Sequence, residues 1–196
     1  MKDWVGNKNS IYKTLGASNH VKDEREENDY YATAPIATKL LLEVETFNNV
    51  LEPACGEGHI SKILIENGIK TTSCDLINRG YGTVKDFLSV EKWDGDIITN
   101  PPYKYAQEFI EHSLKIIPMG NKIAMFLKIQ FLEGQKRKKL FLENPPKTVY
   151  ISSSRIACAK NGKFKVNGKP VSSAVAYAWY IWEKGFKGDP VLKWIN

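Results

Sequence analysis

The sequence contains few of the residues that build metal centres and disulfide scaffolds. Three cysteines and three histidines occur among its 196 residues. The cysteines, Cys55, Cys74 and Cys158, are odd in number and show no CxxC spacing. This pattern argues against disulfide pairing and against a zinc site, and it fits a reducing compartment. We therefore predict no metal ion and a cytoplasmic location.

Long apolar segments are also missing. No apolar run approaches the roughly 18 residues that a membrane-spanning helix needs, and the first residues lack the apolar core of a signal peptide. The chain contains no internal repeat, no low-complexity stretch and no linker that would divide it. We therefore expect no membrane association, a polar arm over residues 1–28, and one domain over residues 29–196.

The charge balance is compatible with a polyanionic partner. Hydrophobic residues make up 42% of the chain, as is usual for a globular protein, but the formal net charge is +6. Residues 155–173 predict a polar, basic hairpin. Its candidate nucleic-acid contacts, together with one lysine earlier in the chain, are Lys104, Arg155, Lys160, Lys163 and Phe164. A basic run over residues 136–139 fits phosphate contact and a solvated helix face equally well.

Hydrophobic periodicity predicts an α/β fold. Strands are expected to begin at Val50 and to cover residues 69–74, 84–88, 94–99, 122–128, 148–151 and 174–182. The segment over residues 84–88 is equally compatible with a turn. Helices are expected over residues 35–47, 60–67, 108–117 and 135–141, and Thr33 is a plausible N-cap for the first of them. The tail over residues 185–196 predicts a closing extension with Trp194 packed down.

A glycine-containing turn joins the first two of these strands through a helix. The stretch Leu51-Glu52-Pro53-Ala54-Cys55-Gly56-Glu57-Gly58 precedes the helix, and Asp75 ends the second strand, where such folds hold ribose hydroxyls. Neither the dinucleotide fingerprint GxGxxG nor a P-loop is present, since Ser61 stands at the third glycine position. Two acidic side chains bracket the turn and would repel a pyrophosphate. A nucleoside with ammonium and sulfonium charges fits better, which predicts S-adenosylmethionine as cofactor.

The strand over residues 94–99 runs into Asn100-Pro101-Pro102-Tyr103. Because proline cannot donate to a sheet ladder, this strand should stop here in a stiff turn. The turn would present one amide, free carbonyl groups and one aromatic ring to a planar group bearing an NH2. The second Asn-Pro-Pro triplet, at residues 144–146, follows a helix and is predicted to be only a helix-terminating turn.

Three stretches of the chain together resemble the S-adenosylmethionine-dependent DNA adenine-N6 methyltransferases. In chain order they are Tyr31-Ala32-Thr33-Ala34-Pro35, the glycine turn and Asn100-Pro101-Pro102-Tyr103. Small phage-type members are the most similar, which would place the protein in a host cytoplasm. The resemblance covers roughly residues 29–184. It implies a Rossmann-like methyltransferase fold, with a seven-stranded, mostly parallel sheet, an antiparallel C-terminal hairpin and helices on both faces.

The resemblance also implies roles for individual residues. The catalytic residues would be Asn100, Pro101, Pro102 and Tyr103. The cofactor-binding residues would be Tyr31, Thr33, Glu52, Pro53, Ala54, Gly56, Gly58, Asp75, Asp86 and Phe87. Asp86 and Phe87 would meet the adenine of the cofactor, the acid through its amino group and the ring through its face.

Two departures from the family pattern stand out. The family has a Thr-Pro pair where this chain has Thr33-Ala34-Pro35, with an extra residue. Few residues follow the last expected strand, so no separate target-recognition domain is predicted. The same motifs also fit methylation of an RNA adenine or of a protein glutamine amide, and a non-catalytic nucleic-acid-binding module on the same fold.

Overall fold

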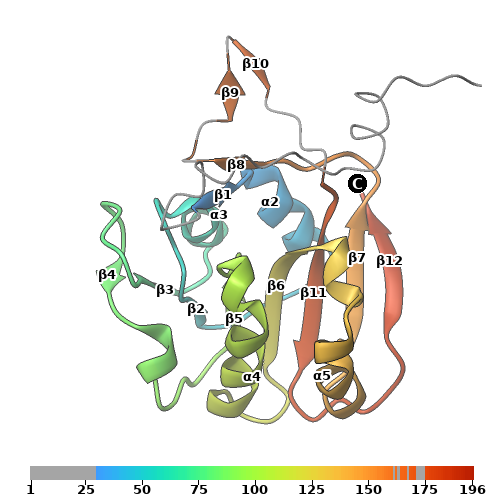
Figure 1. The fold of residues 1–196 in the computed structure, drawn as a ribbon. Helices are drawn as coiled ribbons and strands as arrows, with labels where there is room; N and C mark the ends of the chain where they lie inside the picture. The colour runs from blue at the N-terminus through green and yellow to red at the C-terminus, as the bar shows by residue number, and fades with distance from the viewer. Residues whose placement is uncertain (1–29, 161, 163, 167, 171–174) are drawn as a thin grey trace, which may run out of the picture.

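The main sheet has eight strands. The computed structural model describes residues 30–160, 162, 164–166, 168–170 and 175–196, so the predicted arm over residues 1–28 lies outside the described residues. The strand order is β12-β7-β11-β6-β5-β2-β3-β4 (Figure 1). The strands are β2 (Val50–Glu52), β3 (Thr71–Asp75), β4 (Thr83–Val84), β5 (Ile97–Thr99), β6 (Lys122–Lys128), β7 (Thr148–Ser152), β11 (Tyr177–Glu183) and β12 (Val191–Ile195). All neighbours pair in parallel except the two pairs that include β11.

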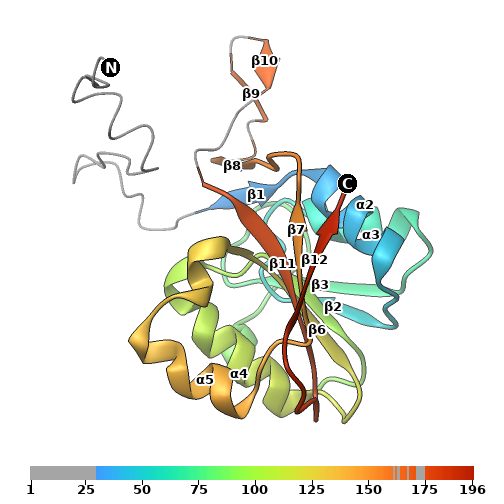
Figure 2. The ribbon, with the colours of Figure 1, turned by 90° about the vertical axis from the view of Figure 1, so that its right-hand side faces the viewer.

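Helices cover both faces of this sheet. They are α2 (Pro35–Val44), α3 (His59–Glu66), α4 (Ala106–Ile116) and α5 (Lys138–Glu143). Figure 2 shows α2 and α3 on one face and α4 and α5 on the other. Each pair buries its own core cluster against the strands, because the strand side chains alternate between the two faces. No described helix is long and apolar enough to cross a membrane.

Strand β11 shows this alternation most clearly. Trp179 packs in the cluster under α2 and α3, whereas Tyr180 and Trp182 pack in the cluster under α4 and α5. All three side chains are almost fully buried. The Trp179 indole donates a hydrogen bond to the carbonyl oxygen of Ala37 over 2.8 Å, which satisfies its one polar atom. The side chains of β11 therefore pack against the helical layers on both faces of the sheet.

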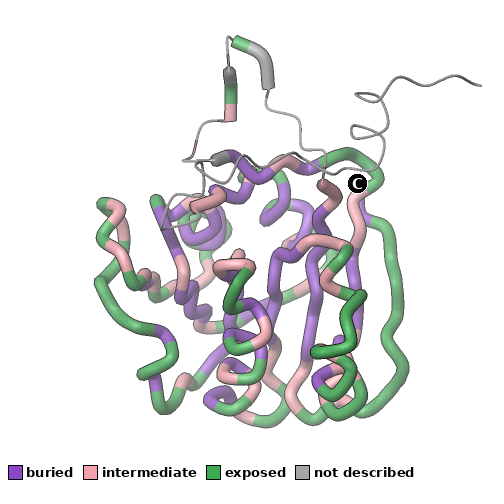
Figure 3. The backbone as a smooth tube through the Cα atoms, in the orientation of Figure 1, coloured by how far each residue is buried: buried purple, intermediate pink, exposed green. Residues whose placement is uncertain are grey.

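Two expectations about local structure are wrong. The tail adds an eighth strand, β12, parallel to β7. Because β12 is an edge strand, most of it is exposed (Figure 3), and Trp194 is 67% exposed rather than packed down. Thr33 does not cap α2: the N-cap is Ala34, without a side-chain hydrogen bond. Pro35 does occupy the first turn of α2, and Asn144 ends α5 just before β7, both as predicted.

Two short ribbons lie outside the main sheet. β1 (Tyr31–Thr33) pairs antiparallel with β8 (Cys158–Lys160), and we call this pair the β1–β8 ribbon. β9 (Lys165–Val166) pairs with β10 (Lys169–Pro170) as a hairpin, within the segment predicted to form one. Figure 1 shows the β1–β8 ribbon lying across the end of the sheet where β6 and the other parallel strands finish. The sequence did not predict this ribbon, and it faces the motif that follows β5.

Candidate active site

Asn100 follows the last residue of β5, as the proline pair predicted. Its side-chain Nδ2 donates to the carbonyl oxygen of Tyr31 over 2.8 Å and also approaches the Cys158 sulfur at 3.9 Å. Its Oδ1 atom is buried and has no hydrogen-bond partner within the described part of the chain. A buried acceptor without a partner is costly, so this oxygen is an acceptor that a ligand can satisfy.

Two threonines at the ends of β1 and β5 have buried hydroxyls that share this property. Thr33 on β1 and Thr99 at the end of β5 each have a buried side-chain oxygen that no described residue contacts by a hydrogen bond. Thr33 lies opposite Cys158 in the β1–β8 ribbon. Two of the buried hydroxyls without a described partner therefore lie next to the Asn100 motif, while the other two, Thr38 and Ser113, lie within α2 and α4. Thr33 was predicted from the motif, whereas Thr99 was not.

Tyr103 begins a short 3-10 helix, Tyr103–Tyr105, immediately after the two prolines. Its ring contacts those of Tyr31 and Tyr177, with centroid distances of 5.8 and 6.0 Å. Its hydroxyl donates to the Cys158 sulfur at 3.6 Å, and burial raises the pKa of Tyr103 well above its usual value. The Lys128 ammonium lies 4.6 Å from the ring centroid. A base stacking on that part of the ring must displace this ammonium.

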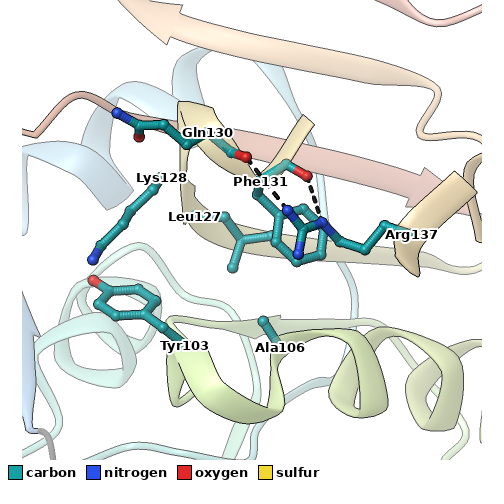
Figure 4. Close-up of a pocket in the computed structure, with 7 residues that line it drawn as sticks. All are labelled: Tyr103, Ala106, Leu127, Lys128, Gln130, Phe131 and Arg137. Carbon is teal, nitrogen blue, oxygen red and sulfur yellow. Dashed lines mark hydrogen bonds between the residues drawn. The ribbon is translucent and has the colours of Figure 1, made fainter. Parts of the chain in front are cut away.

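A cavity of about 200 Å³ opens beside Tyr103 (Figure 4). It is lined by Tyr103, Ala106, Leu127, Lys128, Gln130, Phe131 and Arg137, with no carboxylate among them. The Arg137 guanidinium stacks on the Phe131 ring at 4.6 Å and donates to the Phe131 carbonyl oxygen over 2.8 Å. Arg137 therefore stabilises the loop after β6, while Lys128 faces the cavity. Of these lining residues the sequence predicted only Tyr103 as part of the site, although Lys128 ends the strand next to β5.

The glycine turn lies between β2 and α3, and both glycines adopt positive φ, +54° at Gly56 and +79° at Gly58. A Cβ atom at position 56 would collide with the Tyr30 ring, and one at position 58 with the Tyr81 ring. The Tyr30 hydroxyl accepts from the backbone N–H of Glu57 over 3.1 Å. Because these glycines have no side chains, the rings of Tyr30 and Tyr81 can lie over the turn. The sequence did not indicate either ring as part of the site.

Glu52 and Asp75 make the surroundings of this turn acidic. Glu52 is 1% exposed, and burial raises its pKa to about 8 although Ser61 donates to its carboxylate from both backbone and side chain. Asp75 accepts from the backbone N–H of Gly56 over 2.9 Å and of Ile77 over 3.0 Å. The pKa of the Cys55 thiol rises to about 12 through burial, with the charges of Glu52 and Asp75 adding to the effect. Burial therefore keeps the Glu52 carboxyl protonated at neutral pH, and a cationic ligand beside it would favour its ionised form.

The two residues predicted to contact the adenine of the cofactor differ in exposure, since Asp86 is exposed and Phe87 is buried. Asp86 caps the short 3-10 helix Phe87–Ser89 by accepting from the Leu88 backbone N–H over 2.9 Å. Phe87 is 2% exposed and packs against Phe109 and His112, each at a centroid distance of 4.9 Å. Its ring is therefore part of the core and does not present a face to a ligand, contrary to expectation.

The other predicted residues are spread around the site. Pro53 and Pro101 are buried, and Ala54 and Pro102 are half-buried. Arg155 is exposed, Lys104 lies 5.2 Å from the Tyr105 ring, and Phe164 meets the His59 ring edge-on at 5.2 Å. Phe164 thus brings the start of the β9–β10 segment next to the glycine turn. Lys163 and the side chain of Lys160 lie outside the described part, so their roles stay predictions.

The described residues contain no group of three or more His, Cys, Asp or Glu side chains that could hold a metal ion. No protein-family model matches the sequence, and a search of curated proteins gave no significant match. Solved structures do match. A Thermotoga maritima S-adenosylmethionine-dependent O-methyltransferase is 14% identical with a TM-score of 0.50, over 79% of this chain and 66% of that one.

Two further matches agree with it. A Plasmodium falciparum dimethyladenosine transferase is 16% identical, with a TM-score of 0.50 over 79% of this chain and 62% of that one. A Listeria monocytogenes protein assigned as a class I S-adenosylmethionine-dependent methyltransferase is 15% identical, with a TM-score of 0.50 over 81% and 63%. The chain has the fold of the class I methyltransferases. It spans about two thirds of the length of these structures, and its sheet has eight strands rather than the expected seven.

Proposed function

We propose that this protein transfers a methyl group from S-adenosylmethionine to the exocyclic N6 amine of adenine in DNA. The observation that carries the proposal is the state of the Asn100 amide. Its nitrogen donates to the Tyr31 carbonyl oxygen, and its buried oxygen has no hydrogen-bond partner among the described residues. A buried acceptor at the carboxyl end of a central strand suits a ligand that brings an N–H donor.

The chemistry follows from what this acceptor does to an amine. The nitrogen of an aromatic amine is a weak nucleophile, because its lone pair is delocalised into the ring. An acceptor outside the ring plane, such as Asn100 Oδ1, favours a pyramidal nitrogen and stabilises the positive charge that grows as the bond to carbon forms. The proton of the product amine leaves to water, so the site requires no strong general base. Close approach of the two reactants supplies much of the rate.

The acidic surroundings of the glycine turn fit the cofactor. Glu52 would meet its ammonium group, Asp75 its ribose hydroxyls, and the backbone of Gly56 and Gly58 would pass beneath it. When bound, the cofactor supplies a methyl group on a positively charged sulfur. The rings of Tyr30 and Tyr81 lie over the turn, so cofactor binding requires them to rearrange. Asp75 already accepts two backbone hydrogen bonds, and each of its oxygens keeps a second lone pair for a hydroxyl.

Support for a nucleic acid acceptor comes from charge. The net charge is +6, and the cavity beside Tyr103 contains two cations and no carboxylate. The Tyr103 ring would stack on the base, a contact that contributes about 1–3 kcal/mol in single-strand binders. A duplex substrate would need its adenine flipped out, at a cost of a few kcal/mol. The choice of DNA over RNA rests on the three motifs that resemble DNA adenine methyltransferases.

One experiment tests the acceptor directly. The protein is incubated with S-adenosylmethionine carrying a radiolabelled methyl group and, separately, with duplex DNA, single-stranded DNA, RNA and cell protein. The labelled polymer is then hydrolysed and the modified nucleoside or residue is identified. The expected product is N6-methyladenine in DNA. Label in RNA alone, or on glutamine in protein alone, would overturn the proposed acceptor, and label in none of them would overturn the proposed activity.

A further inference from the structure

The amide of Asn100 is oriented by the β1–β8 ribbon rather than by its own turn. Its Nδ2 donates to the Tyr31 carbonyl oxygen on β1 at 2.8 Å and lies 3.9 Å from the Cys158 sulfur on β8. A primary amide has two N–H donors and one carbonyl acceptor, so the ribbon offers one acceptor for each donor. Turning the amide over would bring Oδ1 against the Tyr31 carbonyl, and two acceptors would then repel each other.

Cys158 contacts both polar members of the motif. The same sulfur that approaches Asn100 accepts a hydrogen bond from the Tyr103 hydroxyl at 3.6 Å. Cys158 is 8% exposed, and burial raises the pKa of its thiol to about 11, so the group stays a neutral thiol at pH 7. A neutral sulfur is a weak acceptor whose long contacts suit two donors that arrive from different directions. The thiol thus links the amide and the ring that the proposed reaction uses.

Simple core packing would not produce this arrangement. Cys158 belongs to the buried cluster that also contains Ile156, and an apolar side chain of similar size would fill the same volume. Such a side chain would leave one Asn100 donor without this acceptor, and the Tyr103 hydroxyl would keep only its side-chain hydrogen bond with Tyr177. Burying a donor without a partner is costly, so the Asn100 amide would rotate towards other acceptors. The chemistry of the sulfur, and not only its volume, is therefore what the motif uses.

We propose that Cys158 is a positioning residue, whose thiol acts with the Tyr31 carbonyl to hold Asn100 Oδ1 and the Tyr103 ring in the orientation needed for methyl transfer. Cys158 touches neither substrate nor cofactor in this role. Its effect on the reaction rate rests on the proposed function. Its effect on the orientation of the Asn100 amide does not, so the two are measured separately.

The orientation is measured on the protein without ligands. The Asn100 side-chain N–H signals are assigned by nuclear magnetic resonance from their loss in Asn100→Ala, and their hydrogen-exchange rates are compared between variants. In Cys158→Ala the exchange of these protons should accelerate at least tenfold. In Ile156→Ala, which removes more buried volume from the same cluster, it should stay within threefold of the wild type. If Cys158→Ala does not fold, Cys158→Val takes its place, because it fills the volume without an acceptor.

The rate is measured in single turnovers with saturating cofactor and the methyl acceptor identified above. Cys158→Ala should lower the transfer rate about tenfold with unchanged cofactor affinity, and Cys158→Ser should stay within threefold of the wild type, because a hydroxyl can also accept. Unchanged amide exchange in Cys158→Ala, or equal acceleration in Ile156→Ala, would overturn the inference. A wild-type protein that transfers no methyl group would overturn the proposed function instead, while the exchange rates would still decide the role of Cys158.

Discussion

The Asn100 side chain donates to the carbonyl oxygen of Tyr31 over 2.8 Å, although the two residues are 69 positions apart in the chain. This hydrogen bond joins the end of a central strand to a two-stranded ribbon outside the sheet. It leaves the amide oxygen as the free end of the side chain. The predictions below test what depends on this oxygen and on the acidic turn beside it.

Replacing Asn100 by Ala should lower the rate of methyl transfer at least 100-fold while the dissociation constant for the cofactor changes less than threefold. The expected size follows the removal of one preorganised donor from an oxyanion hole, which typically costs about 10²–10³ in rate. Single-turnover kinetics and calorimetric cofactor titration measure the two quantities. The matched control is Asn144→Ala, in the second Asn-Pro-Pro triplet, which ends α5 away from the site and should keep its activity. Normal turnover in Asn100→Ala would rule out the mechanism.

Asp75→Ala should weaken cofactor binding at least tenfold, because the variant loses the acceptor proposed for the ribose hydroxyls. The substitution also leaves the backbone N–H groups of Gly56 and Ile77 without their partner, so we expect a loss of about 1–3 kcal/mol of stability. Titration is therefore done at a temperature where circular dichroism shows both proteins folded. Asp94→Asn, which alters an exposed acid at the other end of the sheet, is the control. An unchanged dissociation constant in Asp75→Ala would argue against this site.

The buried carboxyl of Glu52 should make stability depend on pH. Its pKa rises to about 8 on folding through burial, so between pH 4.5 and pH 8 the unfolded chain releases a proton that the folded protein keeps. The contribution of Glu52 to the free energy of unfolding is therefore fully present below pH 4.5. As the pH rises towards 8, the free energy of unfolding falls by up to about 1.4 kcal/mol per pH unit. Urea unfolding at several pH values should show this slope in the wild type and not in Glu52→Gln. If the free energy of unfolding depended on pH in the same way in the wild type and in Glu52→Gln, Glu52 would not be the group that causes the slope.

Gly58→Ala should lower both stability and cofactor affinity, whereas Gly68→Ala should lower stability alone. Both glycines adopt positive φ, +79° and +76°, so alanine is strained at either position, by about 1 kcal/mol. Only at position 58 would the new methyl group also collide with a ring, that of Tyr81. Thermal unfolding and cofactor titration separate the two effects. Equal cofactor affinity in the two variants would show that the turn at Gly58 does not contact the cofactor.

The sequence allowed prediction of those parts of the site that follow strands. The position of Asn100 after a buried strand, and that of Asp75 at the end of another, came from hydrophobic runs and from prolines that stop a ladder. The β6 strand was predicted with the bounds that the structure shows, because its five central residues are all apolar and both faces are covered. Apolar runs of this kind predict strand bounds well where both faces of the strand are buried.

Other features depend on contacts between distant segments, which local patterns do not record. The β1–β8 ribbon consists of three-residue strands more than 120 positions apart, too short for alternation to appear. The sequence showed Cys158 only as a cysteine without CxxC spacing, because its partners Asn100 and Tyr103 come from elsewhere in the chain. Phe87 was assigned to the cofactor for its place beside an acid, but core packing determines where an apolar ring lies. Trp194 was expected to be packed down, yet it lies on the edge strand β12.

The position of β11 has a consequence for how the protein folds. This strand comes after both β6 and β7 in the chain, yet it lies between them and pairs antiparallel with each. Until residues 177–183 leave the ribosome, β6 and β7 each present an unpaired edge, and the slot between them lacks three of the largest buried side chains. The slow step of assembly should therefore be insertion of β11 into this slot, and folding intermediates should be most prone to aggregation just before it occurs.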